Sequence, residues 1–380
     1  MGKITAMGLI FANMHDGVLP ELTANRSMGS VPFGGRYRLI DFPLSGMVNA
    51  GITRVGVITK RNYDSLMDHL GSGKAWDLSR KTEGLCLLTA YCADEEYEGR
   101  IKPLSGAERF LEGAKAEYVV LADSYVAGNI DYAALLQAHV ESGADITVGY
   151  KDGCAPGLRD DLLLSLSRDN WVRDVMIGGG ENREASFGIG LYVISRTLLL
   201  RLTREAAGRS VLSFERGVLQ RHKDYLRIYG YAVPEWTAPI YSLPSFFAAN
   251  MALLDNDVRR RLFVTGRPVY TKVRDCCPAT YGLNSDVTDS LVADGAHIDG
   301  CVRHSILFRD VSVGKHAVVE NAIVMQGSVI MQSAGLCCAV LDKNVTVDLT
   351  VTMEYGYNIP ATCQAVQQEQ CLLRHAYAQH

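Results

Sequence analysis

The stretch PFGGRYRLIDFPLS, residues 32–45, combines more conformationally special residues than a generic fold requires. Its two glycines, Gly34 and Gly35, allow the backbone to turn sharply and to come close to a ligand. Arg36 and Arg38 follow directly, and the next two residues are apolar. The pattern indicates a loop that contacts a ligand and then returns to the core. An ordinary tight turn with solvated arginines is the alternative interpretation.

Length and composition limit the classes of protein to which the chain can belong. Its 380 residues suffice for two domains that each bury a core. The net charge of -4, with mixed signs, argues against a nucleic-acid or membrane-surface partner. Ten cysteines without paired metal spacing indicate reduced thiols in the cytoplasm. The apolar run 6–11 is too short to cross a bilayer and is predicted to be a first buried strand.

Short apolar runs alternate with longer amphipathic stretches as far as about Leu254. This alternation is typical of a parallel sheet covered by helices. Ligands of such sheets bind beyond the carboxyl ends of the strands, so the segments that follow the strands are where chemistry is expected. The predicted strands are residues 6–11, 55–59, 118–122, 146–150 and 190–194.

A six-residue periodicity follows within the region that begins at Ser290. A step of six matches neither a helix nor a single strand, and it is the period of a hexapeptide β-helix whose flat faces stack coil on coil. One phase consists of Val311, Ala317, Ile323, Val329, Leu341 and Val347, and the next of Val318, Val324, Ile330 and Leu336.

Residues 32–45 resemble the signature segment of glucose-1-phosphate adenylyltransferases, which make ADP-glucose from glucose 1-phosphate and ATP. The resemblance extends from Ile4 to about Asp348, with further matches at residues 49–52, 63–70, 249–254, 304–307 and 341–345. It implies an α/β nucleotidyltransferase domain, with a Rossmann-like mixed sheet and helices on both faces, followed by a left-handed parallel β-helix. We place these domains at residues 1–255 and 290–350, separated by a linker at 256–289 and followed by a C-terminal tail at 351–380.

Residues that hold the nucleotide phosphates in catalytic members of the family are replaced here. A glycine-rich loop, an arginine and a lysine perform this task there, because backbone N–H groups and cations neutralise the departing pyrophosphate. An acid in such a loop would repel phosphate. Counted back from Pro32, the glycine positions fall on Asn13, Met14 and Asp16, the arginine position on Val18 and the lysine position on Met28.

The metal-binding positions of the family are also degenerate. The first metal aspartate falls on Asp123 or on Tyr125, depending on which neighbouring segment is aligned, and the second falls on Ala238. Metal-assisted phosphoryl transfer needs oxygen ligands from both sides of the cation. Asp123 is therefore either a remnant of the old site or a strand-terminal cap. The turn before Arg100 resembles a nucleotide-contacting turn, but Arg-Ile-Lys follows it in place of Thr-Ala-Asp.

The matches fall on the framework and the mismatches on catalytic positions, as in the non-catalytic, GlgD-type subunits of the family. The resemblance implies a cytoplasmic regulatory subunit of glycogen biosynthesis, in a heterotetramer with a catalytic subunit. We expect Mg²⁺ in that partner and no cofactor in this chain. Arg26, Arg36 and Arg38 are predicted to bind an anionic effector, and solvated or salt-bridged arginines are the alternative.

Three other functions are compatible with the sequence. An active sugar-1-phosphate nucleotidyltransferase with a rebuilt site would need Asp123 together with Lys60, Arg61 or Lys102. A purely structural scaffold would differ from the regulatory subunit only in lacking coupling to a ligand. A hexapeptide acyltransferase would need a histidine base, for which the candidates are His297, His304 and His316.

Overall fold

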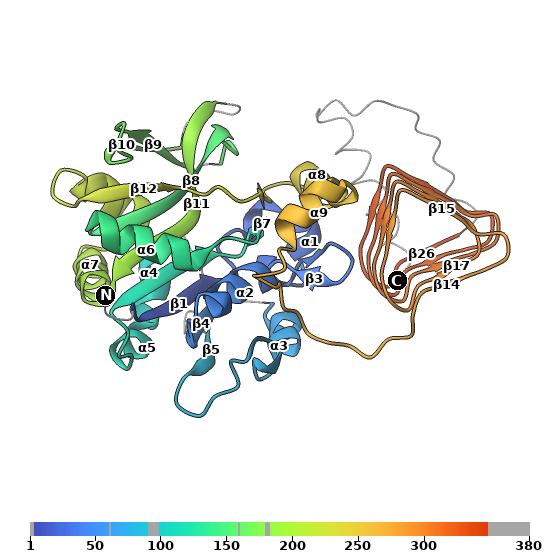
Figure 1. Ribbon diagram of the computed structural model, residues 1–380, viewed down its shortest axis with the longest axis horizontal. Helices are drawn as coiled ribbons and strands as arrows, with labels where there is room; N and C mark the ends of the chain where they lie inside the picture. Colours follow the sequence, from blue (N-terminus) through green and yellow to red (C-terminus); the bar gives the residue numbers. More distant parts are fainter. Residues whose placement is uncertain (1–3, 61, 90–98, 159, 179–182, 349–380) are drawn as a thin grey trace.

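The first domain of the protein is an α/β domain built on a mixed sheet, and the second is a β-helix beside it (Figure 1). The computed structural model describes residues 4–60, 62–89, 99–158, 160–178 and 183–348. In these residues nine strands form the central sheet: β1 (Ala6–Phe11), β4 (Arg54–Thr59), β5 (Gly84–Thr89), β6 (Tyr118–Asp123), β8 (Ile146–Cys154), β9 (Leu162–Leu166), β10 (Val172–Ile177), β11 (Glu184–Ser195) and β12 (Ile228–Ala232).

The strand order explains why the sheet is mixed. β1, β4, β5 and β6 run parallel, whereas β11 lies antiparallel to both β6 and β8. Each of the five predicted strands is present, because each is an apolar run that is buried on both faces. Successive residues of β6 point to opposite faces, so that Val120 enters one core and Leu121 the other.

Helices cover both faces of the sheet. One face packs against α2 (Asp41–Asn49), α3 (Asp64–Leu70), α6 (Tyr132–Ser142) and α8 (Leu243–Met251). The other packs against α4 (Ile101–Gly106), α5 (Glu108–Glu112) and α7 (Arg196–Gly208). In the described part of the chain, no helix combines the length and the apolar character needed to cross a membrane.

Residues 32–38 form a tight hairpin of β2 (Pro32–Phe33) and β3 (Tyr37–Arg38). Gly34 and Gly35 have φ angles of 59° and 83°, a left-handed conformation that glycine adopts without a Cβ penalty, and they begin the three-residue turn 34–36 between the two strands. The Gly34 amide donates to Asn250 Oδ1 of α8 at 2.9 Å, and Gly35 lies against Ala293 and Leu307 of the second domain. The hairpin therefore enters the junction between the domains.

The second domain is a left-handed β-helix with three parallel sheets on its three sides (Figure 1). The first sheet contains β14 (Thr280–Tyr281), β17 (His297–Ile298), β20 (Ser312–Val313), β23 (Val329–Ile330) and β26 (Thr346–Val347). The second contains β15 (Asp286–Thr288), β18 (Cys301–Arg303), β21 (Val318–Glu320) and β24 (Gly335–Cys337). The third contains β16 (Leu291–Val292), β19 (Ile306–Leu307), β22 (Ile323–Val324) and β25 (Val340–Leu341).

The six-residue step is not kept around every coil. Ser312 pairs with Val329, so the chain returns to the same side after seventeen residues, one fewer than three full steps. The residues that point into the β-helix are consequently not always those that the six-residue step predicts. Val318 is 42% exposed, whereas its neighbour Val319 is buried and stacks on Leu336.

The boundaries of the linker differ from those expected at residues 256–289. The helix α9 (Asn256–Leu262) occupies its start, and β14 and β15 already belong to the first coil. The six-residue signal misses them because Asp286 pairs with Cys301, so this coil returns to the same side after fifteen residues, three fewer than three full steps. The intervening chain lies along the first domain, where the Tyr270 amide donates to Ser45 Oγ at 2.8 Å. The predicted tail, residues 351–380, lies outside the described residues.

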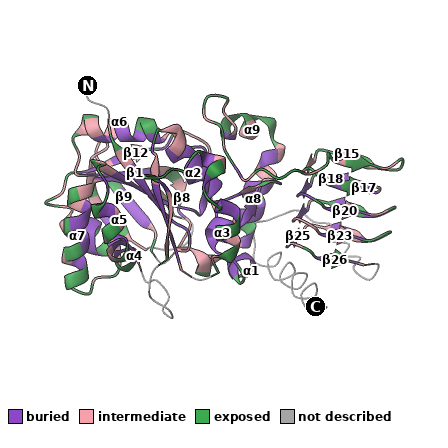
Figure 2. Cartoon of the chain, turned by 90° about the horizontal axis from the view of Figure 1, so that it is seen from below, coloured by how far each residue is buried: buried purple, intermediate pink, exposed green. Residues whose placement is uncertain are grey.

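The junction between the domains is packed like an interior. Ile306, Ile323 and Met325 of the third β-helix side are fully buried in the same apolar cluster as the first domain's core. Figure 2 shows this buried side facing α1 (Pro20–Thr23) and α8, while the outer edges of the coils are exposed. A buried ion pair crosses the junction: Arg26 donates to both carboxylate oxygens of Asp342 at 2.7 Å.

We expect Gly34→Ala to destabilise the protein more than Gly51→Ala does. Both residues have positive φ, which costs a residue with a Cβ about 1 kcal/mol. A Cβ on Gly34 would also lie 2.8 Å from Leu253 Cδ1, whereas nothing lies within 4 Å at Gly51. Overpacking adds roughly 1–3 kcal/mol at Gly34. Urea unfolding of the two variants measures the difference, and equal losses would contradict a role for the hairpin in closing the junction.

Candidate functional site

The loop after β1 is tied to itself and not open to a phosphate. Asn13 Oδ1 accepts from Thr59 Oγ1 at 2.8 Å, and Asn13 Nδ2 donates to Asp16 Oδ2 at 2.6 Å. Asp16 Oδ1 accepts from the Met28 amide at 2.7 Å. Side chains thus occupy the polar groups of this loop. At the family's lysine position, Met28 is fully buried and brings no charge.

Asp123, at the carboxyl end of β6, is engaged by two side chains. Arg100 Nη2 donates to Asp123 Oδ2 at 2.6 Å, and His15 Nε2 lies 3.0 Å from the same oxygen. Tyr125, the other candidate for the metal position, is buried, and its ring centroid lies 4.1 Å from that of His15. Both positions are therefore filled by contacts within the chain.

The second metal position offers no ligand. Ala238 lies on β13 (Thr237–Pro239) and pairs with Ala127 of β7 (Val126–Gly128). No cluster of three metal-ligating side chains is present in the residues that the structure describes. Asp123 Oδ1 is a buried oxygen without a hydrogen-bond partner, but the cation beside this carboxylate is already a guanidinium. The described residues at this edge of the sheet therefore do not fit a catalytic Mg²⁺ ion.

Arg100 was not predicted as a site residue, although the break in the family pattern after residue 99 was visible in the sequence. It lies at the start of α4, is 4% exposed and forms a second ion pair, with Glu215 Oε1 at 3.0 Å from its Nε. Burial alone would lower the pKa of Arg100, but the charges of Asp123 and Glu215 outweigh it and raise that pKa above its ordinary value.

The groups required by the alternative functions are not gathered into a site. Lys102 is exposed on α4, and Arg61 lies outside the described residues. His297 is within 2.8 Å of Thr280 Oγ1, and His304 is within 2.5 Å of Asp289 Oδ2, on different sides of the β-helix. His316 is exposed at a coil corner. His297 and His304 each contact the preceding coil, and the three histidines do not share a site in the described residues.

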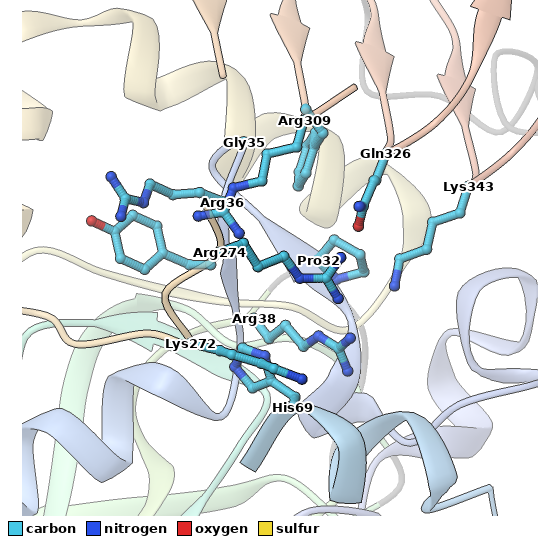
Figure 3. A pocket seen from close by; sticks show the side chains of 12 residues that line it. Pro32, Gly35, Arg36, Arg38, His69, Lys272, Arg274, Arg309, Gln326 and Lys343 are labelled. Carbon is cyan, nitrogen blue, oxygen red and sulfur yellow. The ribbon is translucent and has the colours of Figure 1, made fainter. Parts of the chain in front are cut away.

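A cationic cleft lies at the junction of the two domains (Figure 3). It encloses about 410 Å³, part of which is open to solvent. Among the described residues that line it, six carry a guanidinium or ammonium group and none is acidic. The lining comes from the hairpin, α3, the linker and the β-helix: Pro32, Gly35, Arg36, Tyr37, Arg38, His69, Lys272, Arg274, Phe308, Arg309, Gln326 and Lys343.

The charges in the cleft are only partly balanced. Burial, together with the charges of Arg38 and Arg26, lowers the pKa of Lys343 to about 8. Burial lowers the pKa of Arg38 to about 10, against the attraction of Asp41. The nearby carboxylate of Asp68 is held by Lys272 at 2.9 Å, outside the lining of the cleft. Such depressed pKa values mark a site where a bound anion would stabilise every neighbouring cation.

The predicted effector-binding arginines divide between two locations. Arg36 and Arg38 line the cleft, as Figure 3 shows, with Arg38 also donating to Ser65 Oγ at 2.9 Å. Arg26 is not among the lining residues, because Asp342 holds its guanidinium. The cations that sequence reasoning missed come from segments distant in sequence: Lys272, Arg274, Arg309 and Lys343.

Comparison with known proteins identifies the family. Residues 18–153 match the nucleotidyl transferase family, and residues 277–361 match the GlmU-like, C-terminal hexapeptide family. The chain is 35% identical to the glycogen biosynthesis protein GlgD of Geobacillus stearothermophilus, over 82% of each protein. It is 33% identical to GlgD of Bacillus subtilis, over 81% of each. The chain belongs to the family of the glycogen biosynthesis protein GlgD.

The family resemblance inferred from residues 32–45 is thereby confirmed. A glucose-1-phosphate adenylyltransferase of Geobacillus stearothermophilus is 27% identical over 84% of each protein. One organism therefore carries two members of the family, both of which this chain resembles along most of their length.

Asp16→Asn is expected to increase stability at neutral pH. Burial raises the pKa of Asp16 from 3.8 to about 6, although hydrogen bonds from Met28 and Asn13 oppose the shift. Because the folded state binds this proton more tightly, the stabilisation is complete below about pH 4 and is lost as the pH rises to about 6. We expect a gain of at most about 1 kcal/mol at pH 7, since solvent screening reduces the full linkage value and asparagine can accept only one of the two hydrogen bonds that the carboxylate accepts.

Urea unfolding between about pH 4 and about pH 7 measures this difference. Asp257→Asn, which changes a carboxylate that is 83% exposed, is the matched control. If the free energies of unfolding of wild type and Asp16→Asn differed by the same amount at both pH values, burial would not raise the pKa of this carboxyl group.

Proposed function

We propose that this protein is a non-catalytic, regulatory subunit of glucose-1-phosphate adenylyltransferase in glycogen biosynthesis. In this proposal a catalytic partner subunit converts ATP and glucose 1-phosphate to ADP-glucose and diphosphate. The observation that carries the proposal is the location of the cations. They line a cleft at the domain junction, whereas the strand ends hold a carboxylate already paired within the chain.

The physical requirements of phosphoryl transfer argue against activity of the chain alone. The reaction depends on positioned cations and metal-bound oxygens around the phosphates. At the strand ends, Asp123 is paired with Arg100 and Ala238 supplies no oxygen. A rebuilt site would first have to break a buried ion pair, which leaves uncompensated charge in the interior.

The shape of the cleft supports a regulatory role. Its cations come from both domains, with Arg36 and Arg38 on the hairpin and Arg309 and Lys343 on the β-helix. An anion bound there contacts both domains at once, so its binding free energy depends on how they are packed. A compact ligand with more than one negative charge suits such a set of donors.

The partner is expected to be a catalytic member of the same family in a heterotetramer. Geobacillus stearothermophilus carries both a GlgD protein and a glucose-1-phosphate adenylyltransferase, which is consistent with two kinds of subunit. The first coil of the β-helix exposes Tyr281 and Leu283, which would suit contact with another subunit. Mg²⁺ would act in the partner, and the complex would work in the cytoplasm.

Pyrophosphate release tests this function directly. With ATP, glucose 1-phosphate and Mg²⁺, we expect no turnover from the pure chain, because the described residues at the strand ends offer no group that could hold triphosphate and metal. Mixed with its catalytic partner, the chain is expected to change the rate or the response to an anionic effector severalfold. Clear turnover by the chain alone would contradict the non-catalytic role, and an unchanged mixture would contradict the regulatory one.

Sulfate binding to the chain tests the cleft. We expect sulfate to raise the melting temperature more than sodium chloride of equal ionic strength does, because a specific site binds the folded state. Arg36→Ala and Lys343→Met are each expected to weaken sulfate binding roughly tenfold, the effect of one charge-assisted contact.

The matched control for these variants is Arg303→Ala, which removes an exposed β-helix cation paired with Asp286 outside the cleft. Equal weakening in all three variants would mean that sulfate responds to net charge and not to this site.

A further inference from the structure

The buried ion pairs at the carboxyl end of β6 form a complete internal site for a cation. Asp123 and Glu215 come from different segments and are 5% and 7% exposed, and Arg100 lies between them. Two carboxylates that share a buried site repel each other strongly unless a cation or a proton separates them. Here the guanidinium of Arg100 is the cation that separates the two carboxylates.

The guanidinium is held on its faces as well as at its edges. Arg100 Cζ lies 5.2 Å from the ring centroid of Phe11 and 5.4 Å from that of Tyr192, distances at which a cation is attracted to the ring faces. Tyr192 also donates its hydroxyl to Glu215 Oε1 at 3.0 Å. The aromatic and acidic groups together match the planar shape and charge of a guanidinium.

The backbone on both sides of Arg100 is fixed by the segment that carries Glu215. The Ile101 amide donates to the Leu212 carbonyl at 3.0 Å, and a Cβ on Gly99 would lie 2.3 Å from the same oxygen. On the other side, a Cβ on Gly190 would lie 2.2 Å from Asp123 Oδ2. Backbone therefore presses on the site from two directions, and the cavity beside Asp123 and Gly190 has a mainly apolar lining, in which Asp123 is the one acid among the described residues.

We infer that Arg100 is a built-in replacement for a divalent cation: its guanidinium neutralises Asp123 and Glu215 and keeps metal and nucleotide out of the strand ends. This inference deepens the proposed non-catalytic function and rests on it. A subunit of this kind does not compete with its catalytic partner for Mg²⁺ or ATP. The fold is then stable without a bound metal or nucleotide, because the guanidinium of Arg100 neutralises the buried carboxylates.

Removal of the internal cation should create a vacancy that an added cation can fill. Arg100→Ala is expected to lower the melting temperature by roughly 10 °C, since two buried carboxylates lose their partner. Millimolar guanidinium or Mn²⁺ should restore part of that loss in Arg100→Ala. Neither should stabilise the wild-type chain, nor the double variant Arg100→Ala/Asp123→Asn, in which one of the two negative charges that attract the cation is absent.

Arg204→Ala is the matched control, because Arg204 also pairs with two carboxylates, Glu108 and Glu112, but at the surface. It should melt close to wild type and show no rescue. If Arg204→Ala and Arg100→Ala melted alike, or if Arg100→Ala were not rescued by either cation, the inference would be wrong. Mn²⁺ binding to the wild-type chain that Asp123→Asn abolishes would overturn it as well.

A neutral variant covers the case in which Arg100→Ala does not fold. Arg100→Met/Asp123→Asn/Glu215→Gln removes all three charges while keeping similar volumes, and it should fold with a melting temperature within several degrees of wild type. If it also failed to fold, Arg100 would act through shape and the inference would fail. A chain that shows the rescue pattern but does not alter its partner's rate would disprove the regulatory role and leave the internal cation in place.

Discussion

Apolar packing between the third side of the β-helix and the first domain holds the two halves of the molecule in one arrangement. Ile306, Ile323 and Met325 lose all contact with water there, at a gain of roughly 1.5–3 kcal/mol for each buried side chain. The Arg26–Asp342 ion pair lies in the same junction, where burial makes its geometry strict. Because the junction between the domains is packed in this way, cations from segments far apart in sequence face one cleft.

The charged groups at the end of β6 and those in the cleft are balanced in opposite ways. At the end of β6 each charge has a partner of opposite sign within the chain, and the guanidinium of Arg100 is almost inaccessible. At the domain junction like charges face one another, and burial, with a smaller contribution from the neighbouring cations, lowers the pKa values of Lys343 and Arg38. The first arrangement is stable without a ligand, whereas the second is relieved by an anion.

Much of the fold could be predicted from sequence because it depends on local patterns. The buried strands are continuous apolar runs, and the hairpin at Gly34 and Gly35 requires a conformation that glycine adopts readily. The β-helix was visible from its six-residue step, but its exact inward residues were not, because seventeen-residue coils shift the phase. A periodic pattern in the sequence does not show at which position a coil has fewer residues.

The sites were harder to predict, since they depend on contacts across long sequence separations. Arg36 and Arg38 could be selected from the hairpin, but their companion Lys343 comes from the far end of the β-helix. Arg26 was predicted to bind the same effector, but the carboxylate of Asp342, distant in sequence, holds its guanidinium outside the cleft. Likewise, the sequence located the break in the family pattern near Arg100 but could not reveal that Glu215 completes its environment.

The triad of Arg100, Asp123 and Glu215 also has an evolutionary consequence. Loss of Arg100 alone leaves two buried carboxylates without their guanidinium, and loss of one carboxylate alone leaves the buried guanidinium with a single acidic partner. Substitutions in one charge network are strongly non-additive, so the intermediate sequences are less stable than either end state. Arg100, Asp123 and Glu215 are therefore expected to be substituted together and not one at a time.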